Sequence, residues 1–159
     1  MGHFLISSQT DFEDMTTEEI DYFMGEAMSE GLKAKPNCLP NPPVGCVIVK
    51  DGQIVSRGYT HEPGKHHAEA MALHQLPEGI EDFVMFVTLE PCSFFGRTPS
   101  CAKHIAGTSC KAVYVGMIDP HEKNSGKGIN ILQTAGIEVH VGIREEEVSE
   151  QLSPYLLIG

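Results

Sequence analysis

An amphipathic helix is predicted close to the N-terminus. Thr16 and Glu19 are spaced for a capping box at its start. The apolar pattern weakens at Gly31 and stops before Pro36, which is typical of a helix end. The apolar positions recur at helical spacing, and we interpret them as a face that packs on the core. They are Ile20, Phe23, Met24, Ala27, Met28 and Leu32.

Apolar runs of strand length follow this helix. Residues 45–50 and 53–59 flank Asp51-Gly52, a dipeptide that favours a tight hairpin turn. Residues 83–89 form a continuous apolar run, which is typical of a strand that is buried on both faces. The remaining pattern predicts strands at 112–116 and 138–142 and helices at about 67–75, 101–105, 128–135 and 145–157.

An opening hairpin followed by alternating helices and strands is typical of an α/β fold. The order of elements predicts a three-layer α/β/α domain built on a five-stranded mixed sheet. A length of 159 residues suits one domain, and no internal repeat or linker divides it. We therefore expect a polar, acidic arm at residues 1–15 and a single domain at residues 16–159.

The acidic composition limits the kinds of molecule that we expect this chain to bind. The chain has 11 Lys+Arg against 22 Asp+Glu, a formal net charge of −11. Because polynucleotide binding depends on cationic contacts with phosphates, we expect no polymeric nucleic acid and a small-molecule substrate instead. No apolar run approaches the length of a membrane span, so no membrane partner is expected.

The N-terminal residues and the cysteines indicate in which cellular compartment we expect the protein. The opening residues Met1-Gly2-His3-Phe4 are unlike a signal peptide. Five cysteines, an odd number, fit reduced thiols better than a disulfide framework when no export signal is present. We therefore expect a cytoplasmic protein.

A His-x-Glu motif and two cysteines carry the clearest candidate chemistry. His67-Ala68-Glu69 is followed by Pro91-Cys92, directly after a predicted strand, and by Cys101. One His and two Cys can bind zinc and leave a fourth position for water. A nearby Glu that is not a ligand can then move protons between water and substrate. We therefore hypothesise a zinc site at His67, Cys92 and Cys101, with Glu69 as the proton shuttle.

Taken singly, these residues have simpler interpretations. A His-x-Glu can be a polar helix start, and two cysteines can be core thiols. The combination in this order is much rarer than its parts, which favours the zinc site. We expect His67 and Cys92 at helix N-termini, where the helix dipole favours a thiolate. The residues that we interpret as structural are His66, Cys38, Cys46 and Cys110.

Several segments match a known family. The most specific is Pro-Cys-(x)₃-Gly-Arg-Thr-Pro-x-Cys at residues 91–101, with eight residues between the cysteines. The other matching segments are Asn41–Cys46, His67–Glu69, Asp119-Pro120, Gly126–Gly128 and Ala135–Val139. Over residues 18–157 the chain resembles the cytidine-deaminase-like superfamily and, more narrowly, its riboflavin-pathway deaminases. Most of the superfamily has a shorter spacing between the two cysteines.

The resemblance implies a cytidine-deaminase-like fold with Zn²⁺ as the cofactor. It implies that the zinc ligands are His67, Cys92 and Cys101 and that Glu69 transfers protons. Because superfamily members usually assemble as dimers or tetramers, it also implies a homodimer or homotetramer.

The resemblance further implies contacts with a pyrimidine-type substrate. Asn41 and Arg97 match residues that meet the substrate, and the backbone around Ala68 and Glu90 is expected to touch the base. Asn41 can instead be a turn residue before Pro42, and Arg97 a solvated loop charge.

The chain also departs from the family pattern. We expect no reductase domain of the kind that often follows the deaminase domain, and a separate reductase is then a possible partner. The family usually has a His seven residues before the zinc His, where this chain has Thr60 followed by His61. After Asp-Pro, His121-Glu122 replaces the usual Asn-Pro. We count His61 and His121 among the expected substrate contacts.

Three functional hypotheses follow. The first is deamination of the diaminohydroxyphosphoribosylaminopyrimidine of riboflavin biosynthesis. The second is deamination of another free base, nucleoside or nucleotide of cytosine or guanine type, motivated by Thr60 and His121-Glu122. The third is a non-catalytic binding module stabilised by zinc. Glu69 argues against the third, because a structural zinc site does not need that carboxylate and usually has four protein ligands.

Overall fold

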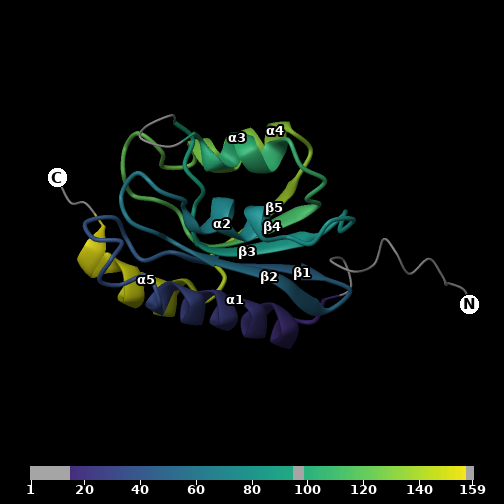
Figure 1. Cartoon of the computed structure of the whole chain (residues 1–159), viewed down its shortest axis with the longest axis horizontal. Helices are drawn as coiled ribbons and strands as arrows, with labels where there is room; N and C mark the ends of the chain where they lie inside the picture. Colours follow the sequence, from purple (N-terminus) through teal and green to yellow (C-terminus); the bar gives the residue numbers. More distant parts are fainter. Residues whose placement is uncertain (1–14, 95–98, 157–159) are drawn as a thin grey trace, which may run out of the picture.

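A five-stranded mixed sheet forms the middle layer of the molecule (Figure 1), in the order β2-β1-β3-β4-β5. β1 pairs antiparallel with both β2 and β3, whereas β3, β4 and β5 run parallel. The predicted mixed sheet is therefore confirmed. The strands are β1 (Gly45–Lys50), β2 (Gln53–Tyr59), β3 (Val84–Leu89), β4 (Ala112–Met117) and β5 (Glu138–Val141).

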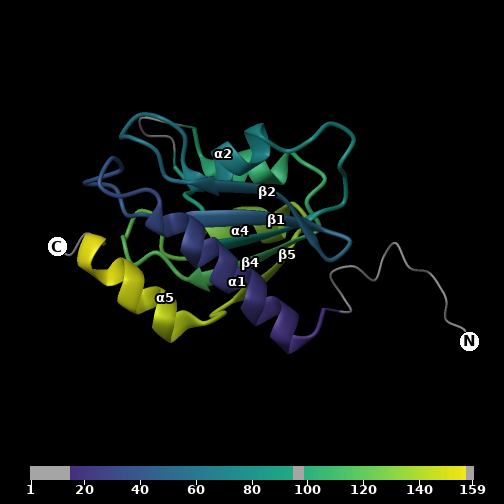
Figure 2. The ribbon, with the colours of Figure 1, turned by 60° about the horizontal axis from the view of Figure 1, so that its bottom comes forward.

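Helices cover both faces of the sheet, as the predicted three-layer α/β/α architecture requires. One face carries α2 (Ala68–His74), α3 (Cys101–Ala106) and α4 (Lys127–Thr134). The other face carries α1 (Thr17–Leu32) and α5 (Glu145–Leu152), which lie side by side in Figure 2. β3 is buried along its whole length, which explains its continuous apolar run.

The computed structural model describes residues 15–94 and 99–156. Most of the expected N-terminal arm lies outside these ranges, but Met15 packs against the core. Within the two ranges, no helix is both long and apolar enough to cross a membrane.

Helix α1 begins with the predicted capping box. The Glu19 N–H donates to Thr16 Oγ1 at 3.1 Å, and the Thr16 N–H donates to Glu19 Oε1 at 2.9 Å. Phe23, Met24 and Ala27 are buried, as expected.

The prediction that Leu32 completes the apolar face of α1 is wrong, because its side chain is 58% exposed. The buried positions in the last turn are Glu30 and Gly31, and a Cβ added at Gly31 would lie 2.7 Å from Pro43 O. The helix therefore turns its small residue, and not its leucine, toward the chain that enters β1.

The C-terminal helix is shorter than predicted. α5 ends at Leu152, and Ser153–Tyr155 forms a 3₁₀ turn instead of continuing the helix to residue 157. Pro154 has no backbone N–H to continue the α-helical ladder, which explains the change. The hairpin is confirmed, since Asp51 and Gly52 both have positive φ, as a type I′ turn requires.

The strand directions bring several chain ends to one edge of the sheet. β3 and β4 are parallel, so their C-terminal ends meet at the same edge. β1 is antiparallel to β3, so it begins there, and Gly45 at its start pairs with Tyr59 at the end of β2. The segments after β2, β3 and β4 and the segment before β1 therefore gather at this edge.

Helix α2 packs unusually close to β2 at Gly58. A Cβ at this position would lie 2.2 Å from Ala68 O and 2.7 Å from Ala72 N. Only glycine permits this approach, which sets the first turn of α2 against the sheet.

Replacing Gly58 with Ala should therefore lower the stability of the fold. Overpacking against backbone atoms costs about 1–3 kcal/mol, so the midpoint of urea unfolding should fall. Gly107→Ala is the control, because the nearest atom, His104 O, would lie 3.6 Å from its Cβ. That variant should stay within about 0.5 kcal/mol of the starting protein. Equal midpoints for the two variants would contradict the packing argument.

Candidate active site

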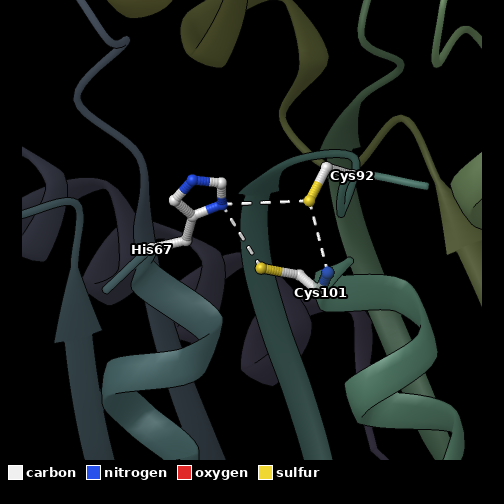
Figure 3. Close-up of side chains that lie close together, drawn as sticks. All are labelled: His67, Cys92 and Cys101. Carbon is white, nitrogen blue, oxygen red and sulfur yellow. Dashed lines mark hydrogen bonds between the residues drawn. The ribbon is translucent and has the colours of Figure 1, made fainter. Parts of the chain in front are cut away.

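Three potential metal ligands converge at the edge of the sheet (Figure 3). His67 Nδ1 lies 3.3 Å from Cys101 Sγ and 3.9 Å from Cys92 Sγ. All three ligand atoms lie within 4.8 Å of one another. His67 is the N-cap of α2, Cys92 lies in the segment after β3, and Cys101 is the first residue of α3.

The segment after β3 is tied to the start of α3 by backbone contacts. Cys92 O accepts from Ser100 Oγ at 2.8 Å and from the Ala102 N–H at 3.0 Å. The Cys101 N–H donates to Cys92 Sγ at 3.2 Å. These bonds hold both sulfur atoms on the same side as His67.

One detail of the prediction needs correction. His67 lies at a helix N-terminus as expected, but Cys92 does not; the cysteine at a helix start is Cys101. The Cys92 sulfur nevertheless accepts the N–H of Cys101, the first residue of α3.

The lowered pKa of one cysteine in the cluster favours the binding of a cation. The hydrogen bond with the Cys101 side chain, helped by His67 and by the Cys101 N–H, lowers the pKa of Cys92 to about 4. The same side-chain contact, together with burial, raises the pKa of Cys101. Without a metal, the site therefore holds one thiolate and one thiol. Because zinc binds thiolates, metal uptake would displace the Cys101 proton.

Zinc fits this donor set. A tetrahedral ion with typical Zn–S and Zn–N bonds separates its ligand atoms by roughly 3.5–3.8 Å. The measured separations of 3.3 and 3.9 Å bracket that range. One imidazole and two sulfurs are also a set that zinc prefers, and none of the three residues is engaged in a disulfide.

Glu69 stands next to the cluster. It is the second residue of α2 and is only 4% exposed. Burial raises the pKa of its carboxyl to about 7, while the positive charge of His67 and a hydrogen bond with Cys101 act in the opposite direction. The structure therefore places a buried carboxyl group beside the candidate metal ligands.

A cavity of about 260 Å³ opens onto these residues. His67, Glu69 and Cys92 form its metal-facing side. The rest of the wall comes from five places along the chain: Asn41, Pro42 and Val44 before β1, Thr60 after β2, Leu89, Glu90 and Phe94 around the end of β3, Asp119 and His121 after β4, and Leu156 near the C-terminus.

The residues that we predicted to contact the substrate lie in different places in the structure. Asn41 and His121 line the cavity. Ala68 is fully buried in the first turn of α2. Arg97 lies outside the described residues, so its expected contact stays a prediction.

The structure does not bring His61 into this cavity. Its Nε2 lies 2.9 Å from Met71 Sδ, and its ring packs near that of Tyr59. Thr60 lines the cavity instead, and its Oγ1 accepts the Val44 N–H at 3.1 Å. Successive residues of an extended chain point to opposite sides, so Thr60 and His61 cannot both face inward.

Several cavity residues were not identified as side-chain contacts from the sequence, among them Asp119, Glu90, Phe94 and Leu156. Asp119 and Glu90 stand in recognisable segments, but nothing in their spacing predicts what their carboxylates bind. Phe94 has a weak signal as an aromatic residue close to Cys92. Leu156 has no signal, because only the docking of α5 brings the C-terminal segment to the cavity.

Comparison with known proteins places this geometry in a family. The model of the cytidine and deoxycytidylate deaminase zinc-binding region matches residues 17–117, more than half of the chain. The chain belongs to the cytidine and deoxycytidylate deaminase family. The expected resemblance is thereby confirmed, together with the fold and the zinc-binding character of the region.

Members of the riboflavin branch are similar over most of the chain. The riboflavin biosynthesis protein RibD of Aquifex aeolicus is 49% identical over 133 residues, which is 83% of this chain and 37% of that protein. A solved structure from Thermotoga maritima, a diaminohydroxyphosphoribosylaminopyrimidine deaminase/5-amino-6-(5-phosphoribosylamino)uracil reductase, has 37% identity and a TM-score of 0.82. That match covers 87% of this chain and 40% of the Thermotoga chain, so this chain spans about two fifths of its relatives.

A second branch of the family shares the fold at lower identity. The dCMP deaminase of the cyanophage S-TIM5 is 28% identical with a TM-score of 0.63. The match covers 80% of this chain and 99% of the phage enzyme. The Thermotoga protein is therefore more similar to this chain in both sequence and structure than the phage enzyme.

Replacing Cys101 with Ala should abolish stoichiometric zinc binding, because two donors remain where the ion needs three. Zinc measured by mass spectrometry on purified protein should fall from about one per chain to a small fraction of that. Cys110→Ala is the matched control, since Cys110 is equally buried and lies outside the cluster. Full zinc content in the Cys101 variant would refute the ligand assignment.

Proposed function

We propose that this chain is a zinc-dependent hydrolytic deaminase of the diaminohydroxyphosphoribosylaminopyrimidine of riboflavin biosynthesis. The observation that carries the proposal is the cavity in which Glu69 meets His67 and Cys92, with Cys101 behind them. The 49% identity with a riboflavin biosynthesis protein supports this choice of substrate. The reaction replaces the exocyclic amine of the pyrimidine with a carbonyl oxygen and releases ammonia.

In this proposal His67, Cys92 and Cys101 hold the zinc. When bound there, zinc supplies a Lewis-acidic centre that makes water nucleophilic near neutral pH. The bonds from Ser100, Cys101 and Ala102 to Cys92 keep the two sulfurs in place, so little rearrangement is needed for metal binding.

Glu69 is the proposed catalytic proton shuttle. Its carboxylate takes a proton from the attacking water and delivers it to a ring nitrogen of the substrate. The carboxylate then takes the second proton from the hydroxyl group that has added to the ring carbon and delivers it to the amine, which leaves as ammonia as the carbonyl forms. Burial beside the cavity supports this role, because it keeps the carboxyl away from bulk water and close to the reacting atoms.

The cavity wall supplies the proposed substrate contacts. Asn41 can hydrogen-bond the base, and Phe94 offers an aromatic face to it. Val44 and Leu156 exclude water from the apolar side. We also propose contacts from Arg97 and from the backbone at Ala68, and we place the polar tail of the substrate near His121.

A second candidate is deamination of another small base, nucleoside or nucleotide. It is favoured by the acidic character of the tail end of the cavity, where Asp119 accompanies His121. Glu122 follows directly in the sequence and adds a further negative charge close to this end. Negative groups disfavour a phosphate, so a substrate without one would meet less repulsion there. A non-catalytic module is less well supported, because it leaves the buried Glu69 without a role.

The setting of the reaction is also proposed. The small cavity supports a small-molecule substrate. All five cysteines are free, which supports a reducing compartment such as the cytoplasm. We propose a homodimer or homotetramer, which light scattering can test.

Replacing Glu69 with Gln should leave zinc content unchanged but lower turnover by at least about 10²-fold, the usual contribution of general acid–base catalysis. Gln keeps the size of the side chain and cannot accept and return a proton. Ammonia release and zinc content should be measured on the same preparation. Turnover close to that of the starting protein would rule out the proposed shuttle.

The substrate itself can be tested by ammonia release from zinc-loaded protein. The panel should contain the diaminopyrimidine ribotide, its dephosphorylated form, and common nucleosides and nucleotides including dCMP. We expect release from the ribotide alone. Release only from the dephosphorylated compound or from another nucleoside would support the second candidate and overturn the first.

A further inference from the structure

Glu90 is a buried carboxylate beside the cavity, and the proposed chemistry gives this residue no role. It follows β3 directly, precedes Pro91-Cys92, and is 3% exposed. Its oxygens accept three backbone N–H groups from the chain after β4. Oε1 accepts from Asp119 at 3.1 Å and from Gly126 at 3.0 Å, and Oε2 accepts from Ile129 at 3.1 Å.

These contacts make Glu90 the cap of helix α4. The N-cap residue of this helix is Gly126, which has no side chain to accept the free N–H groups of the first turn. Glu90 accepts the N–H of Gly126 and that of Ile129, three positions further on. The positive end of the helix dipole stabilises the buried carboxylate in return.

From this cap, a series of hydrogen bonds reaches His121. Asp119, whose N–H is held by Glu90, accepts the His121 N–H through Oδ1 at 3.0 Å. Its Oδ2 accepts from Asn124 Nδ2 at 3.3 Å. The Lys123 N–H donates to His121 Nδ1 at 3.1 Å, so a neutral imidazole carries its proton on Nε2. The ring therefore has a fixed orientation and a defined donor.

The same loop is anchored to the segment that carries Cys92. Asn124 Nδ2 donates to Pro91 O at 3.2 Å, and Ser93 Oγ donates to Lys123 O at 3.3 Å. A Cβ at Gly128 would lie 1.9 Å from Pro91 O, so the backbones are in direct contact. Cys92 itself is held separately, through its carbonyl and sulfur, by the start of α3.

We propose that Glu90 is a positioning residue for substrate binding: it fixes the loop from Asp119 to Ile129 so that His121 meets the polar tail of the substrate. The inference rests on the proposed function for its account of the tail. Under this proposal, the substrate-binding loop and the zinc cluster are held by different contacts, because Cys92 is anchored to α3. Loss of the Glu90 contacts should therefore weaken substrate binding without removing the metal.

Glu90→Gln is the sharpest substitution. A glutamine keeps the volume but has one acceptor oxygen and an NH₂ group. Whichever way the amide turns, its NH₂ faces at least one of the three N–H donors that the carboxylate now satisfies. The variant should lose protection from amide exchange at Asp119, Gly126 or Ile129 by about tenfold or more, as expected for a lost bond to a charged group.

The kinetic expectation is a split between KM and kcat. For zinc-loaded Glu90→Gln, KM for the ribotide should rise about tenfold while kcat changes by less than about threefold, the pattern of lost uniform binding. Glu30→Gln is the matched control. Glu30 is equally buried and accepts from Lys33 Nζ and Arg57 Nη1, but it lies on α1 across the sheet from α4. Its loss should lower stability and leave KM unchanged.

A double-mutant cycle with His121→Ala decides whether Glu90 acts through His121. If it does, Glu90→Gln should raise KM little further once His121 is removed. Independent, multiplying effects on KM would overturn the proposal, and so would a Glu90→Gln protein with unchanged KM and amide protection, or one that loses its zinc. Amide exchange is measured without turnover of a substrate, so it tests the positioning role separately from the proposed function. If the starting protein fails to deaminate the ribotide, the proposed function is wrong, while full protection in the variant would separately overturn the positioning role.

Asp119→Asn provides a second route if Glu90→Gln does not fold. It keeps the Glu90 cap on α4 but weakens the bond to the His121 N–H or to Asn124. We expect a raised KM with Ile129 still protected. Unchanged KM in this variant would overturn the proposal.

Discussion

The set of hydrogen bonds between Cys92 and the start of α3 is the interaction on which the candidate site depends. The carbonyl of Cys92 accepts from Ser100 and Ala102, and its sulfur accepts from the Cys101 N–H. These contacts join a segment that leaves β3 to a helix that begins nine positions later. His67 completes the cluster because Gly58 lets α2 lie close against β2. The geometry of three ligands therefore depends on two close backbone approaches.

Three buried glutamates show how the same side chain serves different purposes. Glu30 is balanced by Lys33 and Arg57 and ties α1 to β2. Glu90 is satisfied by backbone N–H groups and fixes a loop beside the cavity. Glu69 interacts with His67, with Cys101 and with the backbone, but burial outweighs these contacts and raises its pKa to about 7. A carboxyl with a pKa near neutral pH is suited to proton transfer.

The cavity illustrates why a mixed sheet suits this chemistry. The switch from antiparallel to parallel pairing at β3 brings four segments to one edge of the sheet: those after β2, β3 and β4 and the one before β1. The side with the candidate metal ligands comes from α2 and the segment after β3, whereas the opposite side comes from the segment before β1, the segment after β4 and the C-terminal segment. The reaction type and the substrate tail can therefore vary separately on one scaffold.

Local patterns in the sequence determined the elements and the candidate metal ligands. The capping box at Thr16 and Glu19, the hairpin turn at Asp51-Gly52 and the apolar run of β3 each depend on neighbouring residues, and each was predictable. His67, Cys92 and Cys101 were identifiable because zinc requires particular donors in a particular order. The exposure of Leu32 and the early end of α5 were missed, since both depend on how a helix end meets its surroundings.

Only the tertiary structure decided which side chains face the cavity. Thr60 points inward and His61 outward because of the register at the end of β2. Leu156 reaches the cavity through the docking of α5, and the carboxylate of Glu90 finds its partners 29 to 39 positions away. Such contacts join residues that are distant along the chain. The packing of helices and loops against the sheet sets them, and no local spacing in the sequence encodes that packing.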